Sequence, residues 1–304
     1  MEIAIMLEGQ NGLNWSNWQR FARVVEDLGF AGLYRSDHFT NAEPPNQDSL
    51  ELWVALTWLA SHTQRIEFGP LVSPVSFRHP AMLVRMASAV DDLSGGRLTF
   101  GVGAGWQDRE HQMYSFDLLG IDDRFARFEE ALQIMHRLLK QADPVTFEGE
   151  YYQFHEAVLL PRPQRPGGPP ILIGGKGPKR TLPLVARYAD EWNGVFMKPT
   201  HYAELNTQLD TLLHQHNRPP NSVRRSLMTG LAFGRDDAEA RRRLSYYGAS
   251  DPAELLPRGI IFGTASAVQD QLGAFAEAGV QRIMLQWLDL DDIDGLEALA
   301  QTVL

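Results

Sequence analysis

The fold and function predicted for this chain depend most on residues 97–110, Arg97-Leu-Thr-Phe-Gly-Val-Gly-Ala-Gly-Trp-Gln-Asp-Arg-Glu110. Its first half is apolar and typical of a buried strand, and its second half contains Gly101, Gly103 and Gly105, followed by Trp106 and a charged cluster. Glycines at the end of a strand let the backbone approach a flat or anionic group, because no Cβ stands in the way. Taken alone, the same pattern fits a tight strand-to-loop turn equally well.

Strand and helix patterns alternate along the rest of the chain in both directions from this stretch. Short apolar runs predict strands over residues 3–7, 31–35, 66–72, 98–102, 170–173, 192–196, 227–233 and 282–287. Helical spacing of apolar residues predicts helices over 15–28, 48–61, 80–93, 124–139, 202–216, 265–278 and 293–303, and another that ends at 189 with Pro183 in its early turns. Asp48 and Ser49 are expected to cap the second helix, and Pro80 to begin the third.

Two segments interrupt this alternation. Residues 145–160 alternate and turn at Gly149, which predicts a β-hairpin, and residues 161–170 form a Pro- and Gly-rich connector. Residues 235–263 begin as a basic helix and become irregular. Eight strand–helix units predict a parallel sheet closed into a (β/α)8 TIM barrel, with insertions after strands 4 and 7 and a single domain over 1–304. An open doubly wound sheet is the alternative, but the dinucleotide-binding glycine fingerprint is incomplete.

Composition excludes several classes of function. The net charge of −10 argues against a general nucleic-acid or anionic-membrane surface. The absence of cysteine excludes disulfides, thiolate metal sites and cysteine nucleophiles, and it fits a cytoplasmic protein. The first residues are acidic and continue directly into a strand pattern, so no signal peptide is expected there, and no apolar run is long enough for a membrane span.

Residues at the predicted strand ends are the candidates for chemistry, because a barrel builds its site there. Asp37 and His38 follow the second strand and are the best acid–base pair, since histidine titrates near neutral pH. The structural alternative is that Asp37 caps a turn and that the His38 ring only packs against its neighbours. A metal site at Asp37, His38, His79 and Glu110 is disfavoured, because the several His and Asp ligands that barrel hydrolases use are missing.

Other strand ends suggest a place for an anion and an aromatic wall. Gly174-Gly175-Lys176-Gly177 before a helix, with Lys179 and Arg180, fits a phosphate cradle or a solvated strand-to-helix turn. Trp106 either lies against a flat ring or belongs to the core. Glu110 fits the role of a carboxylate at the start of a helix better than the role of a catalytic residue.

Several motifs, in order, make the chain resemble the luciferase-like monooxygenase superfamily. They are Ser36-Asp37-His38-Phe39, Arg78-His79-Pro80, residues 92–98 (DLSGGRL), residues 101–106 (GVGAGW), residues 171–175 (ILIGG) and residues 187–190 (RYAD), with later matches at 263–264 and 278–280. Each motif is weak, but the ordered set is specific. The strand-two Asp-His and the Gly-Ala-Gly-Trp loop resemble the F420-dependent branch.

The resemblance implies a (β/α)8 barrel that binds coenzyme F420, or alternatively FMN, at its mouth, and a homodimer. It implies that His38 handles a proton, with Glu110 as a possible helper, and that a non-prolyl cis peptide lies near Leu71-Val72. The coenzyme-binding residues expected from it are Asp37, Leu71, Val72, Ser73, Pro74, Ala104, Gly105, Trp106, Arg109, Gly174, Gly175, Lys176, Gly177, Lys179 and Arg180.

Trp106 departs from the F420-dependent sugar-phosphate dehydrogenases, which carry a glutamate at this position. Sugar-phosphate oxidation is therefore disfavoured. The resulting hypotheses are an F420-dependent oxidoreductase that acts on a small organic substrate, an FMN-dependent monooxygenase that uses O2 and a reductase partner, and a non-catalytic coenzyme-binding barrel. A metal hydrolase ranks below all three.

Overall fold

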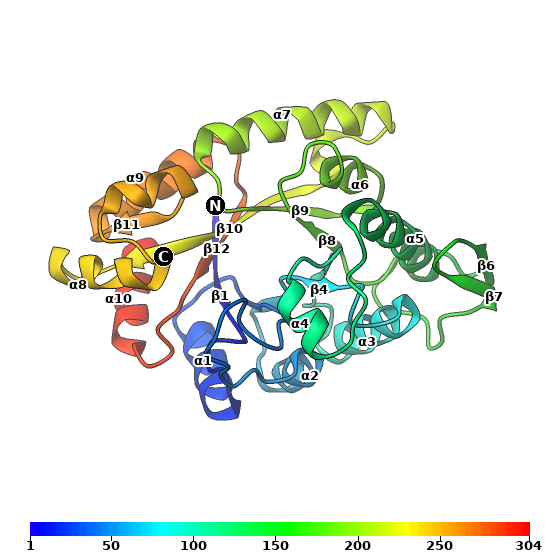
Figure 1. Ribbon diagram of the computed structural model, residues 1–304, viewed down its shortest axis with the longest axis horizontal. Helices are drawn as coiled ribbons and strands as arrows, with labels where there is room; N and C mark the ends of the chain where they lie inside the picture. Colours follow the sequence, from blue (N-terminus) through cyan, green and yellow to red (C-terminus); the bar gives the residue numbers. More distant parts are fainter.

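Parallel strands form the inner ring of the molecule, which a computed structural model describes over residues 1–304 (Figure 1). The ring consists of β1 (Glu2–Leu7), β2 (Gly32–Arg35), β3 (Glu67–Pro70) continued by β4 (Ser73–Pro74), β5 (Phe100–Gly103), β8 (Ile171–Gly174), β9 (Glu191–Val195), β10 (Arg224–Phe233) and β12 (Arg282–Gln286). The hydrogen-bonded order runs β3-β2-β1-β12-β10-β9-β8-β5-β4. A bridge between Phe68 and Leu98 joins the two ends. The predicted barrel is therefore confirmed over the open sheet.

Helices surround this ring. They are α1 (Trp15–Asp27), α2 (Leu52–His62), α3 (Pro80–Leu93), α5 (Ile121–Lys140), α6 (Thr181–Tyr188), α7 (Pro199–Gln215), α9 (Ala265–Glu277) and α10 (Ile293–Val303). In α1 the residues Trp18, Phe21, Ala22 and Val25 are buried, so the apolar stripe read from the sequence faces the ring. No helix combines the length and the apolar character that crossing a bilayer requires.

Alternate residues of the strands face two different cores. In β1, Ile3 and Ile5 belong to the large core between strands and helices, whereas Ala4 and Met6 belong to a small apolar cluster with Tyr34. Leu71, Leu172, Met228 and Met284 complete this small cluster. It lies inside the barrel and forms an apolar floor beneath the strand ends.

The two predicted insertions contain secondary structure of their own. A β-hairpin of β6 (Val145–Glu148) and β7 (Gln153–Ala157) lies between α5 and β8. Between β10 and α9 the chain forms α8 (Asp237–Arg242), three 3-10 helices over 243–258, and β11 (Ile261–Gly263), which pairs with β10. A further 3-10 turn, Pro220–Ser222, precedes β10.

Two local predictions need correction. The second helix begins at Leu52, because the side chain of Glu51 rather than Asp48 or Ser49 caps it and accepts from the backbone N–H of Val54. The third strand is interrupted between β3 and β4, where the Leu71–Val72 peptide is cis, as the family resemblance implied. The segment after β5 contains a helix, α4 (Asp108–Met113), which begins two residues before Glu110, where the sequence indicated a helix start.

Candidate active site

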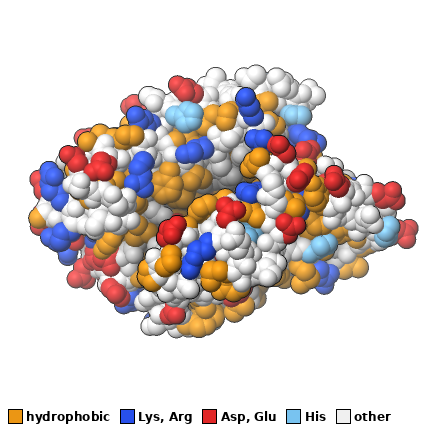
Figure 2. All heavy atoms as spheres, in the orientation of Figure 1, with side chains coloured by type: hydrophobic (Ala, Val, Ile, Leu, Met, Phe, Trp, Pro, Cys, Tyr) orange, Lys and Arg blue, Asp and Glu red, His pale blue; other side chains and the backbone are white.

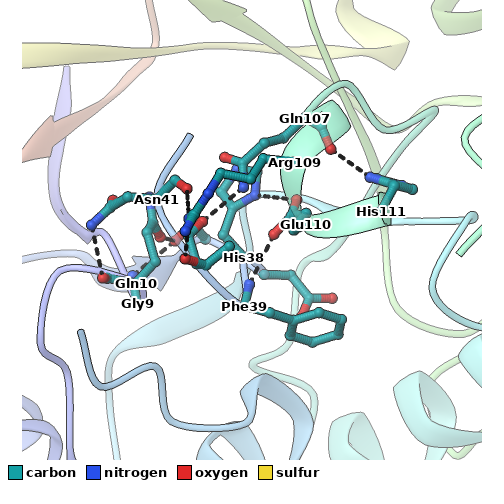
Figure 3. Close-up of polar contacts among 12 residues, drawn as sticks. Gly9, Gln10, His38, Phe39, Asn41, Gln107, Arg109, Glu110 and His111 are labelled. Atoms are coloured by element: carbon teal, nitrogen blue, oxygen red, sulfur yellow. Dashed lines mark hydrogen bonds and ion pairs between the residues drawn. The ribbon is translucent and has the colours of Figure 1, made fainter. Parts of the chain in front are cut away.

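The strand ends that were predicted to carry chemistry meet at one face of the barrel. Figure 2 shows a hollow near the centre of this face, with hydrophobic side chains inside it and both acidic and basic side chains around its rim. His38 follows β2 and α4 follows β5, and these two segments lie against one another (Figure 3).

The ring of His38 is held by a buried carboxylate. His38 Nδ1 lies 2.7 Å from Glu110 Oε1, and the backbone N–H of Phe39 donates to Glu110 Oε2 over 2.9 Å (Figure 3). The side chain of Glu110 is 1% exposed, whereas that of His38 is 18% exposed. Glu110 therefore starts a helix, as the sequence indicated, and also orients the histidine, which the sequence left open.

The direction of the hydrogen bond between His38 and Glu110 determines which nitrogen of the imidazole carries the proton. An ionised carboxylate can only accept, so Nδ1–H of His38 donates to Glu110. Nε2 makes no hydrogen bond within the protein and is not enclosed, so it is the nitrogen available to a ligand. A neutral His38 is thus held with its basic nitrogen free, which is the arrangement a proton donor or acceptor needs.

Neighbouring charges tune the proton affinity of His38. Burial lowers its pKa, but the hydrogen bond and the charge of Glu110 act in the opposite direction. The charges of Glu8 and Asp37 also raise the pKa, and the net result lies above the ordinary value for histidine. The protonated form of His38 is therefore stabilised in the folded protein.

Trp106 lies beside this histidine at the surface. Its ring is edge-on to the His38 ring, with centroids 5.5 Å apart, and the residue is 61% exposed. Trp106 is therefore not a core residue. Its ring lies next to the imidazole of His38 at the barrel mouth, and a contact with a flat ligand ring stays a prediction.

Asp37 is engaged by protein groups. It is buried, accepts from Ser73 Oγ over 2.6 Å and forms an ion pair with Arg78 over 2.5 Å. Arg78 also pairs with Glu51 over 2.6 Å. The sequence identified Arg78 only as part of a motif, but its guanidinium neutralises Asp37, and with Ser73 it fixes the loop after β4 against the end of β2.

Glycines make room for Val72, which the break between β3 and β4 places against β5 and β8. A Cβ on Gly103 would lie 2.6 Å from Val72 Cγ2, and one on Gly101 or Gly174 would lie 3.2 Å from Val72 Cγ1. Gly105 has φ +88° and would bring a Cβ within 2.8 Å of Ser76 Oγ. These glycines are therefore required for close backbone packing at the mouth.

The predicted anion cradle lies at the start of α6. Gly175 has φ +136°, a conformation that favours glycine, and Trp192 Nε1 donates to its carbonyl over 2.8 Å. Lys176 Nζ donates to Phe196 O over 3.2 Å, and Arg180 is paired with Asp122. Lys179 is exposed and forms no ion pair, so it is the freest of the three predicted cations.

Arg109 bonds to protein groups instead of standing free. Its guanidinium donates to Thr40 Oγ1 over 2.7 Å, to Asn41 O over 2.8 Å and to Asn46 Oδ1 over 2.7 Å. All three acceptors belong to the loop after β2. The hydrogen bonds of Arg109 therefore tie that loop to α4.

Sequence reasoning left one further polar group at the mouth without a role. Glu8 Oε1 accepts from Gln286 Nε2 over 2.6 Å, and Glu8 Oε2 accepts from Gln10 Nε2 over 2.9 Å. Glu8 follows the predicted strand 3–7 and Gln286 lies near the end of the predicted strand 282–287, and these positions are the signal that could have linked them. No group of three or more His, Asp or Glu side chains is arranged to hold a metal ion.

Comparison with known proteins agrees with this geometry. The luciferase-like monooxygenase family profile matches residues 1–258. An F420-dependent glucose-6-phosphate dehydrogenase of Intrasporangium calvum is 28% identical over 76% of this chain and 73% of its own length. A 4-hydroxyprotoasukamycin monooxygenase of Streptomyces nodosus subsp. asukaensis is 32% identical over 55% of this chain and 43% of its own length.

A solved F420-dependent secondary alcohol dehydrogenase, in complex with an F420–acetone adduct, shares the fold. The superposition has a TM-score of 0.87 at 19% identity, and it covers 99% of this chain and 98% of the other. The family match spans most of the chain and includes the segments that carry His38, Asp37 and α4. The chain therefore belongs to the luciferase-like monooxygenase family.

Proposed function

We propose that this protein is a coenzyme F420-dependent oxidoreductase that transfers hydride between C5 of the deazaflavin and a small organic substrate. The observation that carries the proposal is the free Nε2 of His38, presented beside Trp106 at the barrel mouth while Glu110 holds Nδ1. The F420-dependent relative named above supports the choice of coenzyme. Asp37 and Ser73 are engaged with Arg78, so His38 is left as the proton-handling group.

The residues at the mouth fit a coenzyme with a flat ring and an anionic tail. Val72 and the glycines around it offer an apolar backbone surface for a ring, next to the interior cluster that contains Leu71. The residues that would hold the ring are Asp37, Leu71, Val72, Ser73, Pro74, Ala104, Gly105 and Trp106. Gly174, Gly175, Lys176, Gly177, Lys179 and Arg180 would hold the phosphate end. When bound, the deazaflavin supplies the hydride chemistry.

The chain itself moves the proton. Oxidation of an alcohol to a carbonyl releases a proton from the hydroxyl, and the reverse reaction needs one at the carbonyl oxygen. His38 Nε2 accepts or donates that proton, while Glu110 stabilises the imidazolium through Nδ1–H.

An FMN-dependent monooxygenase that uses O2 and a reductase is the second candidate, because a monooxygenase is among the relatives. The test is to titrate the coenzyme-free protein separately with F420 and FMN and to follow ligand fluorescence. Tight binding of F420 supports the proposal, and tight binding of FMN alone contradicts it. A non-catalytic coenzyme-binding barrel predicts binding without turnover of any donor or acceptor.

The role of His38 needs a separate measurement. In His38→Ala, F420 should still bind, but its single-turnover reduction by a donor found in a substrate screen should slow by about 10²- to 10⁴-fold, the usual contribution of general acid–base catalysis. An unchanged rate with intact binding would show that His38 does not handle the proton.

We also propose a cytoplasmic homodimer with one domain per chain and no nucleic-acid partner. The absence of cysteine and the net charge of −10 support the location and the absence of a nucleic-acid partner. Val54 on α2 and Met82 on α3 are 56% and 53% exposed on two helices that pack together, which supports a partner surface there. Sedimentation of Val54→Asp and Met82→Asp against the unmodified chain tests the dimer.

A further inference from the structure

Helix α4 and its N-cap residue are bonded to two other loops of the mouth, one after β2 and one after β4. Gln107 Nε2 donates to Thr40 O over 2.7 Å, and Arg109 donates to the same loop. Glu110 accepts from His38 (Figure 3). His111 Nε2 lies 2.8 Å from Ser76 Oγ in the loop after β4. The helix therefore links the loops that follow three neighbouring strands.

Helix α4 has no means of holding its own position. It contains six residues, and its N-cap residue Gln107 makes no side-chain capping bond. A helix this short is unstable by itself in water, where about 12–15 residues are needed even for favourable sequences. Its place, and with it the place of the Glu110 carboxylate, is therefore set by contacts to other segments.

Arg109 supplies the contacts on one side. Its guanidinium makes three hydrogen bonds of 2.7–2.8 Å to the 40–46 segment, including one to the carbonyl of Asn41. That segment continues directly from Phe39, whose N–H is bonded to Glu110. Arg109 thus fixes the distance between α4 and the chain that carries His38.

His111 supplies the contact on the other side. It is 2% exposed, and its Nδ1 lies 2.6 Å from the carbonyl of Gln107, an acceptor only, so Nδ1 carries the proton. In the neutral ring Nε2 then accepts from the hydroxyl of Ser76. Phe77 packs on the ring with centroids 4.8 Å apart, so the contact is specific in direction and enclosed.

From these contacts we infer that Arg109 and His111 are positioning residues for the proton transfer, acting through α4 to keep the Glu110 carboxylate on His38 Nδ1. The inference rests on the proposed function of His38. It also assigns Arg109, which was predicted to bind the coenzyme, a role that needs no contact with it.

The charges around His38 show why the position of α4 matters. Glu110 approaches from α4, Glu8 from the end of β1, and Asp37 from the end of β2, where Arg78 pairs with it. Among these, Glu110 alone is hydrogen-bonded to the imidazole. Displacing α4 would remove that bond. Less would then offset the effect of burial, which lowers the pKa of His38.

The experiment compares Arg109→Gln and His111→Phe with two controls on α5. Arg137→Gln removes an arginine that donates to the carbonyl of Thr146, and His136→Phe removes a half-buried histidine packed on Tyr188. The full-length protein without coenzyme is labelled with ¹⁵N-histidine, and the His38 ring is titrated by NMR. The unmodified chain and both controls should titrate alike, whereas both α4 variants should titrate at lower pH.

A second readout is kinetic. With F420 bound, both α4 variants should lose about tenfold in the single-turnover rate, while the dissociation constant of F420 changes less than about twofold. His111→Gln keeps a group that can accept from Ser76 and should restore the titration. Arg109→Lys keeps the charge and part of the hydrogen bonding, and it serves as the folded substitute if Arg109→Gln does not fold.

Two outcomes overturn the inference. One is a folded α4 variant in which His38 titrates as in the unmodified chain, and the other is a shift of equal size in the α5 controls. A protein that binds no F420 but shows the expected NMR shifts would contradict the proposed function and leave the structural coupling through α4 intact. The two failures are therefore distinguishable.

Discussion

Replacing Glu110 with glutamine tests the centre of the proposed site. The carboxylate receives two donors, Nδ1–H of His38 over 2.7 Å and the N–H of Phe39 over 2.9 Å. A glutamine side chain of the same size has one acceptor oxygen, and its NH2 group would face the second donor. Because Glu110 is 1% exposed, water cannot replace the lost partner.

The expected losses follow from this count. Losing one hydrogen bond to a charged group, with its buried donor left unpaired, costs about 1.5–3 kcal/mol, so Glu110→Gln should lower the free energy of unfolding by about this amount. The single-turnover rate should fall by about 10- to 100-fold, less than for removal of the histidine itself.

The stability loss should also depend on pH in a defined direction. The pKa of His38 is raised in the folded protein, so its pairing with Glu110 contributes fully below the unfolded value of about 6.5. That contribution disappears as the pH rises through the folded value. The difference in unfolding free energy between the unmodified chain and Glu110→Gln should therefore be larger at about pH 5.5 than at about pH 9.

Urea unfolding at several pH values measures this difference. Glu130→Gln is the matched control, because Glu130 also accepts backbone N–H groups, from residues 150–152, and lies away from His38. Its stability loss should not follow the titration of a histidine. A pH-independent loss in Glu110→Gln, together with an unchanged His38 titration, would refute the reasoning.

Three further substitutions test other parts of the mouth. Gly101→Ala should cost about 3 kcal/mol or more in thermal unfolding, because its Cβ would lie 2.0 Å from a carbonyl oxygen of β3, whereas Gly273→Ala, with no atom within 4 Å, should be stabilising by about 0.5–1 kcal/mol. Equal effects would contradict the packing argument. Asp37→Asn removes one of the two carboxylates on Arg78 and should cost about 1–3 kcal/mol, and an unchanged melting temperature would show that the pair contributes nothing. Trp106→Glu should add a second ionising group beside the histidine and give the single-turnover rate a bell-shaped pH profile, and a profile with one limb would show that position 106 does not reach the reaction.

The barrel could be predicted because parallel strands buried on both faces leave continuous apolar runs in the sequence. β1 is an example, and α3 and α10 begin and end where the pattern indicated. Helix α4 could not be predicted in the same way. Its sequence, Asp-Arg-Glu-His-Gln-Met, has no apolar stripe, and the contacts that hold it come from loops distant in the sequence.

The candidate site likewise contains residues whose position the sequence predicts and contacts that it does not predict. His38 and Asp37 were predictable from their place at a strand end, whereas the bond from Glu110 to His38 spans 72 residues of sequence. Arg109 shows the limit most clearly, because a cation near a predicted anion site is the same residue type whether it binds a ligand or a loop. Only its direction in the fold, toward Thr40 and Asn46, separates the two.

The position of the acid also bears on the direction of the reaction. The Trp106 ring lies edge-on to the His38 ring, and the carboxylate of Glu110 is bonded to Nδ1 of His38. In the proposed function, Nε2 is the atom that exchanges a proton at the mouth, and the raised pKa of His38 keeps the ring protonated to a higher pH than that of a free histidine. A protonated ring donates to a carbonyl oxygen, which suits reduction of the substrate. A deprotonated ring accepts from a hydroxyl, so the same geometry favours oxidation as the pH rises.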